Sequence, residues 1–192
     1  MPINKLGGEY YNDDELHAAG FMSIGENVKI HNRSSIYCPE NISIGDNVVI
    51  QDFVVIVATG RVEIDDNVEI NCFSYIGGTY GVCIGKYVTL APGVRVFSVS
   101  DDYSGKFLMH RRHFLKEHMG KDIGQVTIKD YAIIGVDSVV MPNIEIGIGA
   151  SVGAMSFVTQ DLHPWSINCG CPAKKIGNRK KDMLDYLESD KS

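Results

Sequence analysis

Aliphatic residues recur along this chain at two fixed spacings, and this recurrence limits the folds that the chain can adopt. In the first half, equivalent positions are twenty residues apart, and positions within one unit are six apart. The three series are Ile24, Ile44, Ile64 and Ile84; Ile30, Ile50, Ile70 and Leu90; and Ile36, Ile56, Ile76 and Val96. A valine follows each member of the first series four residues later: Val28, Val48, Val68 and Val88. A six-residue unit of this kind predicts a short strand and a turn, with both apolar side chains facing inward.

Units of this size cannot bury their apolar faces alone, so they must stack on one another as a solenoid. Three units form a triangular coil, and two residues are inserted at one corner of the early coils, as at Asn41-Ile42 and Arg61-Val62. Later coils lack the insertion, and their aliphatic series runs at a spacing of six: Ile128, Ile134, Val140, Ile146, Val152 and Val158. We therefore predict an all-β parallel solenoid of about six coils, roughly 29 Å long at ~4.8 Å per coil.

Glycine and asparagine also recur at fixed positions after the first aliphatic series. They are Gly25, Gly45 and Gly85, one position after it, and Asn27, Asn47 and Asn67, three positions after it. Both residue types tolerate positive φ, so we expect both sets to form the tight corners of the coils.

The composition limits the class of protein. The chain has 192 residues, 44% of them hydrophobic, which suffices for one domain with a sizeable core. A net charge of −6 argues against nucleic-acid binding through bulk charge. The sequence has neither an apolar run near the ~20 residues of a membrane span nor a signal-peptide pattern. Five cysteines favour free thiols and a cytoplasmic location, with Cys38, Cys72 and Cys83 as small apolar fillers within the coils.

The expected single domain, 1–192, is built from successive segments. Segment 1–21 contains a short helix, capped by Asn12 or Asp13 and ended by Gly20, that covers the open end of the stack. The coils occupy 22–97 and 126–160, and the tail 161–192 includes a helix over about 179–188 with an apolar stripe. Between the two sets of coils, 98–125 is expected to form a long protruding loop without regular structure, and such loops are usually functional.

Two short runs, one within the later coils and one in the tail, carry a family resemblance. They are 134–142, Ile-Gly-Val-Asp-Ser-Val-Val-Met-Pro, and 170–176, Gly-Cys-Pro-Ala-Lys-Lys-Ile. Together with the coils and the loop, they resemble the bacterial hexapeptide-repeat acetyltransferases over about 12–180, and look most similar to the galactoside, maltose and polysaccharide O-acetyltransferase branch. The resemblance implies a left-handed β-helix, a homotrimer with active sites between subunits, acetyl-CoA as co-substrate, no metal, and a histidine base in the loop.

The resemblance therefore predicts acetyl transfer to a sugar hydroxyl, in bacterial surface-polysaccharide metabolism. A hydroxyl is a poor nucleophile, so a base near neutral pKa must take its proton as it attacks the thioester. Backbone N–H groups can stabilise the resulting oxyanion.

On the acceptor side, the resemblance assigns the family's orienting asparagine to Asn71, but the position of its catalytic histidine falls on Asp101. Aspartate is a weaker base than imidazole, so three explanations stay open. Asp101 or Asp102 could act directly, or the acceptor could be an amine, which needs less help from a base. The explanation that we favour is that His110 or His113 enters the site from later in the loop.

The same loop supplies the expected substrate contacts. Asp102 and Tyr103 are expected to contact the acceptor, and Arg111, beside Arg112, suits an anionic sugar phosphate.

On the donor side, the resemblance assigns four positions to the CoA groove: Val136, Ala154, Thr159 and Gln160. Small residues there, including Gly135 and Gly153, are expected to let the pantetheine arm approach the backbone. Lys174 and Lys175 match the tail that meets the CoA phosphates, and lysine suits a phosphate as a point charge.

Three other functions remain under consideration. An N-acetyltransferase of a nucleotide-linked amino sugar would tolerate Asp101 at the base position. A metal-dependent hydratase needs several histidines on the coil faces, whereas the coils contain His31 alone. A non-catalytic scaffold would need neither the long loop nor the CoA-like tail.

Overall fold

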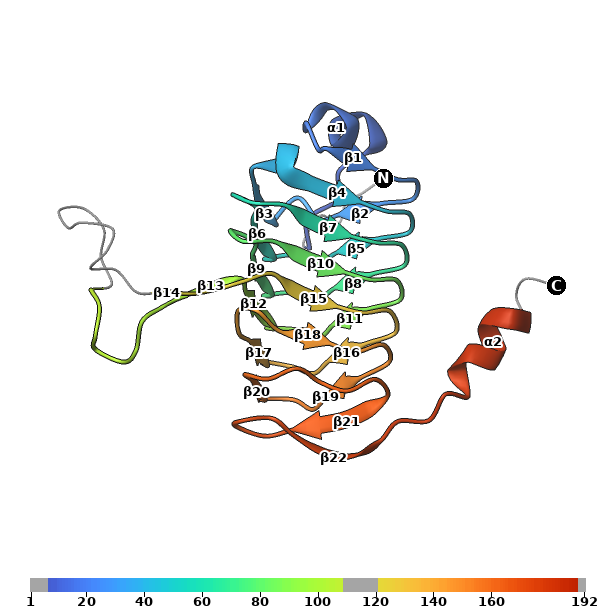
Figure 1. Ribbon diagram of the computed structural model, residues 1–192. Coiled ribbons are helices and arrows are strands. Elements are labelled where there is room, and N and C mark those ends of the chain that lie inside the picture. The colour runs from blue at the N-terminus through green and yellow to red at the C-terminus, as the bar shows by residue number, and fades with distance from the viewer. Residues whose placement is uncertain (1–6, 109–120, 190–192) are drawn as a thin grey trace.

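The structure, a computed structural model, describes residues 7–108 and 121–189. It is a left-handed parallel β-helix of about 7 turns, in which three sheets form the faces of a triangular prism (Figure 1). The predicted all-β solenoid is therefore confirmed. The stack has about one turn more than the six coils that we expected.

The three faces are built from strands that return once per coil. The first sheet contains β1 (Ser23–Ile24), β4 (Ile42–Ile44), β7 (Val62–Ile64), β10 (Val82–Ile84), β15 (Val126–Ile128) and β18 (Glu145–Ile146). The second contains β2 (Lys29–Ile30), β5 (Val49–Ile50), β8 (Glu69–Ile70), β11 (Thr89–Leu90), β16 (Ile133–Ile134), β19 (Ser151–Val152), β21 (Ser166–Cys169) and β22 (Lys174–Asn178). The third contains β3 (Ser35–Tyr37), β6 (Val55–Val57), β9 (Tyr75–Gly77), β12 (Arg95–Phe97), β17 (Val139–Val140) and β20 (Phe157–Val158).

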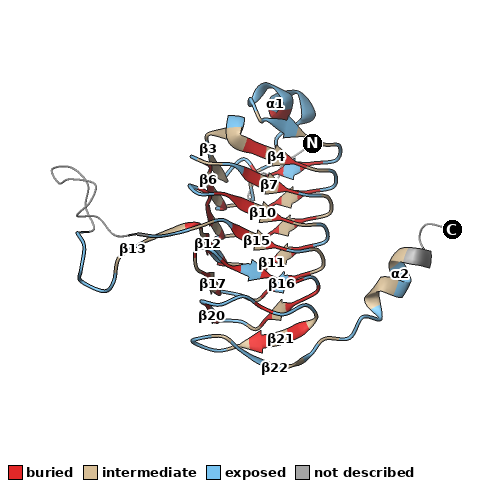
Figure 2. Ribbon diagram, in the orientation of Figure 1, coloured by how far each residue is buried: buried red, intermediate tan, exposed pale blue. Residues whose placement is uncertain are grey.

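Each predicted aliphatic series forms the buried column of one sheet. Ile44 pairs with Ile64 in the first sheet, and Ile50 pairs with Ile70 in the second. These columns fill the interior of the prism, where most of their members are at most 3% exposed (Figure 2). Full burial of one such side chain stabilises the fold by roughly 1.5–3 kcal/mol, so the columns supply most of the driving force for stacking.

The segment between the two sets of coils, 98–125, does not interrupt the stacking of the coils. Val82–Ile84 pairs directly with Val126–Ile128, so the coils continue as if the intervening loop were absent. Our expectation of a loop without regular structure was wrong at both of its ends. β13 (Val99–Asp101) and β14 (Lys121–Ile123) form an antiparallel pair, and this hairpin stem projects from the side of the prism (Figure 1). Antiparallel pairing satisfies the backbone groups of a segment that leaves the solenoid.

The two expected corner sets differ in their structural role. Asn27, Asn47 and Asn67 have φ values of 55°, 57° and 59°, as predicted. The glycine set was wrong, because these glycines do not have positive φ. A Cβ on Gly45 would lie 2.4 Å from Asp66 Oδ1 and 2.9 Å from the Asp65 carbonyl carbon. Glycine is required there because the next coil passes too close for a side chain.

The N-terminal helix closes one end of the stack (Figure 1). α1 (Asp13–Ala18) begins after Asn12, whose side chain accepts a hydrogen bond from the Glu15 N–H at 2.9 Å. The Glu15 carboxylate in turn accepts from the Asn12 N–H at 2.8 Å, which completes a capping box. Leu16 is 4% exposed and joins the core cluster, so the helix covers apolar residues of the first coil.

The C-terminal tail was predicted less well. It adds β21 and the antiparallel β22 to the second sheet, where we expected no further strands after 160. α2 (Met183–Ser189) begins four residues later than expected. Arg179 is the reason, because its N–H donates to the Trp165 carbonyl at 2.7 Å and its Nη1 donates to the Tyr131 carbonyl at 2.7 Å. These bonds hold Arg179 extended along the prism.

Candidate functional site

One face of the prism is apolar on its outer side. The outward positions of the third sheet are mostly apolar or aromatic (Tyr37, Val55, Val57, Tyr75, Phe97, Val139 and Phe157), interrupted by Ser35, Gly77 and Arg95. Those of the first sheet carry Ser23, Ser43, Glu63, Cys83, Thr127 and Glu145. Tyr37 and Phe157 are 56% and 37% exposed. A largely apolar outer face of this extent marks a surface for binding.

A cleft lies where the hairpin stem leaves this face. It has a volume of about 780 Å³ and is lined by Phe97, Val99, Ser100, Asp101, Tyr103, Val139, Met141 and Phe157. Its walls are mainly apolar, and Asp101 supplies a carboxylate at the rim. A carboxylate beside an apolar wall can accept a proton from a nucleophile while that nucleophile attacks an acyl donor held in the cleft.

Ser98 anchors the base of the hairpin. Its side chain is fully buried, its Oγ donates to the Gly77 carbonyl at 2.7 Å, and the same Oγ accepts from the Tyr80 N–H at 2.9 Å. The Gly124 N–H donates to the Ser98 carbonyl at 3.1 Å, so both ends of the stem are tied to one buried residue. This arrangement fixes the position of Asp101, three residues further along.

The two neighbouring aspartates have different surroundings. The Asp102 carboxylate accepts from Ser104 Oγ at 2.8 Å and from the Phe107 N–H at 3.3 Å, which closes a tight turn. The Ser104 hydroxyl bond, with the backbone N–H groups, lowers the pKa of Asp102. A carboxylate held in this way is a poor proton acceptor, so Asp102 stabilises the loop and Asp101 is the better candidate base.

Asn71 is not among the described residues that line this cleft. It lies at the corner between the second and third sheets, half-buried, and its Nδ2 donates to the Leu90 carbonyl at 3.1 Å. Within one chain, Asn71 precedes the third-sheet strand β9 whereas Asp101 follows the third-sheet strand β12, so the two residues are at opposite edges of that sheet. His110, Arg111 and His113, with Arg112, lie outside the described residues, and Tyr103 is 87% exposed at the cleft rim.

The residues expected on the donor side lie on the later coils. Val136 and Ala154 are exposed at the same corner as Asn71, Thr159 and Gln160 are exposed at the next corner after β20, and Lys174 and Lys175 are exposed on β22. Our explanation for the small residues was incomplete. A Cβ on Gly135 would lie 2.5 Å from the Ala154 nitrogen, so the adjoining coil already requires glycine there.

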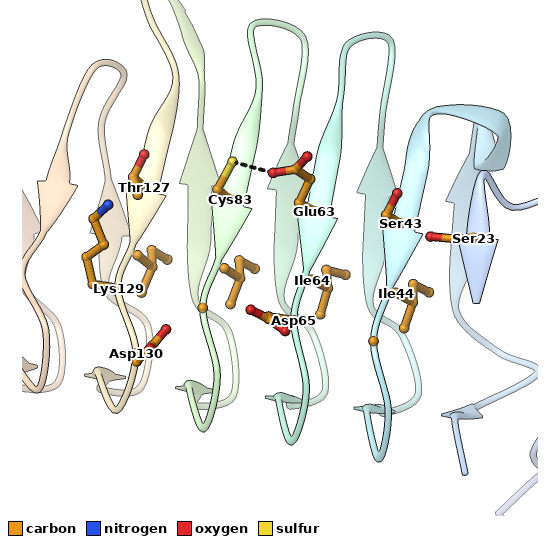
Figure 3. Close-up of a pocket in the computed structure, with 14 residues that line it drawn as sticks. Ser23, Ser43, Ile44, Glu63, Ile64, Asp65, Cys83, Thr127, Lys129 and Asp130 are labelled. Atoms are coloured by element: carbon orange, nitrogen blue, oxygen red, sulfur yellow. Dashed lines mark hydrogen bonds between the residues drawn. The ribbon is translucent and has the colours of Figure 1, made fainter. Parts of the chain in front are cut away.

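The polar first sheet carries a shallow furrow that is separate from the cleft (Figure 3). Cys83 faces outward in it and donates to Glu63 Oε2 at 3.2 Å, so our expectation of an apolar filler was wrong for this cysteine. Burial, and then the bond to Glu63, raise the pKa of the Cys83 thiol to about 11. In the described ranges, no three His, Cys, Asp or Glu side chains come together to hold a metal ion.

The raised pKa predicts an unreactive thiol. At pH 8 roughly one Cys83 side chain in a thousand is a thiolate, so iodoacetamide should modify it at least ~10-fold more slowly in the folded protein than in urea. Peptide mass spectrometry after timed labelling measures this ratio. Equal rates in the two states would contradict the assigned environment.

Sequence reasoning missed the apolar cleft wall. Val139 and Phe157 occupy the outward positions of their strands, next to the buried Val140 and Val158. The alternation indicates that these two side chains face outward, but it does not indicate a cleft, because the cleft also depends on the hairpin stem. Within the described part of the chain, no helix is long and apolar enough to cross a membrane.

Comparison with known proteins gives close relatives over nearly the whole chain, although no family model matches it. The dTDP-4-amino-4,6-dideoxy-D-glucose acyltransferase of Escherichia coli is 39% identical over 181 residues, which cover 94% of this chain and 93% of that protein. AntD, an N-acyltransferase from Bacillus cereus in complex with dTDP and 3-hydroxybutyryl-CoA, is 35% identical with a TM-score of 0.89, over 96% of this chain and 100% of that chain. A variant of AntD in complex with dTDP-4-amino-4,6-dideoxyglucose and coenzyme A is 34% identical with a TM-score of 0.90, over 95% and 97% of the two chains.

These relatives correct the expected reaction. Sugar O-acetylation was wrong, because the full-length relatives act on, or bind, a nucleotide-linked amino sugar. The expected branch was wrong for the same reason, whereas the hexapeptide-repeat fold and acyl transfer from coenzyme A are supported. Asp101 at the base position was the sequence signal that favoured the amine.

Proposed function

Because the chain belongs to the hexapeptide-repeat acyltransferases, the family of the dTDP-4-amino-4,6-dideoxy-D-glucose acyltransferase, we propose that it N-acylates a nucleotide-linked amino sugar. The donor is an acyl-CoA, and acetyl-CoA and 3-hydroxybutyryl-CoA are the two donors to test first. The observation that carries this proposal is Asp101 at the rim of an apolar cleft, which suits an amine better than a hydroxyl.

The chemistry balances without a covalent enzyme intermediate. The amino nitrogen of the sugar attacks the thioester carbonyl carbon, the carbon–sulfur bond breaks, and the coenzyme A thiolate leaves. Asp101 accepts the proton that the nitrogen loses, and the thiolate takes up a proton from solvent. A neutral amine is a far better nucleophile than a hydroxyl, so an aspartate is sufficient as the base.

The donor and acceptor ends of the site follow from the position of the assigned residues along the prism. Val136 and Ala154, with Thr159 and Gln160, would hold the pantetheine arm along the later coils. Lys174 and Lys175 would contact the phosphates of coenzyme A. Asp101, Tyr103 and Asn71 would form the acceptor end.

We also propose that the working assembly is a homotrimer whose apolar third sheets meet at the centre. Tyr37, Val57 and Tyr75 on that sheet, which do not line the cleft, would be removed from water by such contact. In this arrangement the corner that carries Asn71 approaches the hairpin of a neighbouring copy. Asp101 of one copy would then meet Asn71 of the next.

A shared site predicts complementation between inactive variants. When Asp101→Asn and Asn71→Ala are unfolded, mixed in equal amounts and refolded together, about one quarter of the sites in a random trimer should carry both native residues. The mixture should therefore regain up to about one quarter of the wild-type rate, measured by thiol release from acyl-CoA. A mixture as inactive as its parents would place both residues in the site of the same chain.

The proposed reaction is tested by thiol release with matched acceptors. dTDP-4-amino-4,6-dideoxyglucose should support rapid release of coenzyme A, whereas dTDP-glucose, which carries a hydroxyl at that carbon, should support a rate close to the background hydrolysis. Transfer to the hydroxyl acceptor at a comparable rate would overturn the proposal.

A further inference from the structure

An aromatic pair stands exposed at the corner between the second and third sheets. Phe53 and Phe73 occupy equivalent positions in neighbouring coils, and their rings stack with centroids 5.2 Å apart and planes within 6°. The Arg33 guanidinium lies 5.9 Å from the centroid of the Phe53 ring, so the ladder extends over three coils. Phe53 is 43% exposed and Phe73 is 61% exposed.

The ladder stops at a glycine. Because Ile70 pairs with Leu90, the position one coil beyond Phe73 is Gly93, which has no side chain to cover the second face of the Phe73 ring. The neighbouring polar groups are Arg95 Nη1, which donates to the Gly93 carbonyl at 3.0 Å, and Asp137 Oδ1, which lies 3.7 Å from that same Arg95 nitrogen. An aromatic face next to hydrogen-bonding groups is a suitable binding site for a planar polar ring.

A second corner of the same prism shows how such a gap can be filled. There Tyr87 and Tyr131 stack at 5.5 Å, and Trp165 continues the ladder at 6.4 Å from Tyr131. The intervening coil carries Gly149, and a Cβ on Gly149 would lie 2.5 Å from the Trp165 ring. The indole therefore occupies the space that this glycine leaves. At Gly93 an added Cβ would lie 2.2 Å from Asp137 Oδ1 and 3.1 Å from Asp137 Cγ, so a carboxylate side chain, and no aromatic ring, lies beside this glycine.

The position of the gap relates it to the proposed acceptor. Phe73 lies two residues after Asn71 in the same turn, and Val136 and Ala154 follow on later coils of the same corner. We infer that the exposed face of Phe73, beside Gly93, stacks the planar pyrimidine base of a nucleotide-linked acceptor. This inference rests on the proposed function and adds a base-binding residue to it.

The inference is tested by calorimetric titration of dTDP into the full chain. Loss of one base–aromatic stack weakens binding by roughly 5- to 150-fold, so Phe73→Ala and Phe73→Leu should both raise the Kd for dTDP by about tenfold or more. Leucine keeps apolar volume but has no π face. Tyr87→Ala is the matched control. Like Phe73, Tyr87 is exposed, stacks on another aromatic ring and has a positive φ, but it lies on another corner of the prism. It should leave the Kd for dTDP unchanged, and all variants should bind coenzyme A like the wild type.

Several results would overturn the inference. They are an unchanged Kd for dTDP in Phe73→Ala, a wild-type Kd for dTDP in Phe73→Leu, or a variant whose binding of coenzyme A is weakened while its binding of dTDP is not. A smaller assembly of Phe73→Ala in light scattering, with both ligands lost, would assign the ladder to contact between copies. A different result would overturn the proposed function: wild-type protein that neither binds dTDP nor releases coenzyme A when the amino sugar is supplied. If the wild type does both and Phe73→Ala matches it, the base-binding role alone fails.

Discussion

Replacing Asp101 by asparagine should lower kcat/KM for the amino-sugar acceptor by about 10²–10⁴-fold, the usual contribution of a general base. Asparagine keeps the size and polarity of the side chain but cannot accept the proton from the attacking nitrogen. The Kd of coenzyme A should stay within about twofold of wild type, because Asp101 is assigned to the acceptor end. Steady-state thiol release, with the nucleotide-linked amino sugar varied, measures the effect.

Asp122→Asn is the matched control for this substitution. Asp122 lies on β14, opposite Ser100 in the same hairpin stem, and is exposed as Asp101 is. The control removes one negative charge from the same stem but should retain most of the activity. Comparable losses in both variants would indicate a general effect of charge on the hairpin. Near-normal activity of Asp101→Asn would return the role of base to a residue outside the described ranges, such as His110 or His113.

The second large effect is expected in the core. Ile134 is fully buried in β16, in the middle of the second sheet, and pairs with Leu90 on one side and Val152 on the other. Ile134→Ala should lower the free energy of unfolding by about 2–5 kcal/mol, because it removes buried methyl groups and leaves a cavity between coils. Denaturant unfolding at a fixed protomer concentration measures the change, since assembly would otherwise shift the apparent stability.

Ile133 gives the control within the same strand. Its side chain points outward and is 38% exposed, so Ile133→Ala should cost less than about 1 kcal/mol. The pair separates burial from strand propensity, because both variants remove a β-branched residue from β16. Equal losses would mean that the inward and outward assignment of this strand is wrong.

The solenoid was predictable because its driving force is local and repeated. Ile44, Ile64 and Ile84 are buried for the same reason in successive coils, so their spacing determines the sheet, the face and the register together. The glycines were harder to interpret, because the reason for Gly45 is the carboxylate of Asp66 in the next coil rather than its own φ. Contacts between coils are not visible in a single repeat.

The candidate site was predictable only in part. The sequence shows Asp101 at the position of the family's histidine, but the meaning of this departure depends on the acceptor, and a hydroxyl was chosen where relatives act on an amine. The distinct role of Asp102 follows from Ser104 and Phe107, which bind its carboxylate in a turn that spacing alone does not define. Asn71 illustrates a further limit, since its relation to Asp101 depends on how copies of the chain meet.

The central claim is that this protein acylates the nitrogen of a nucleotide-linked amino sugar. Its most direct test is mass spectrometry of one reaction that contains acyl-CoA with equal amounts of dTDP-4-amino-4,6-dideoxyglucose and dTDP-glucose. The account predicts that the mass of the amino sugar alone increases by one acyl group, and that the product is stable to mild base, as an amide is. Acylated dTDP-glucose, or a base-labile ester on the amino sugar, would contradict it.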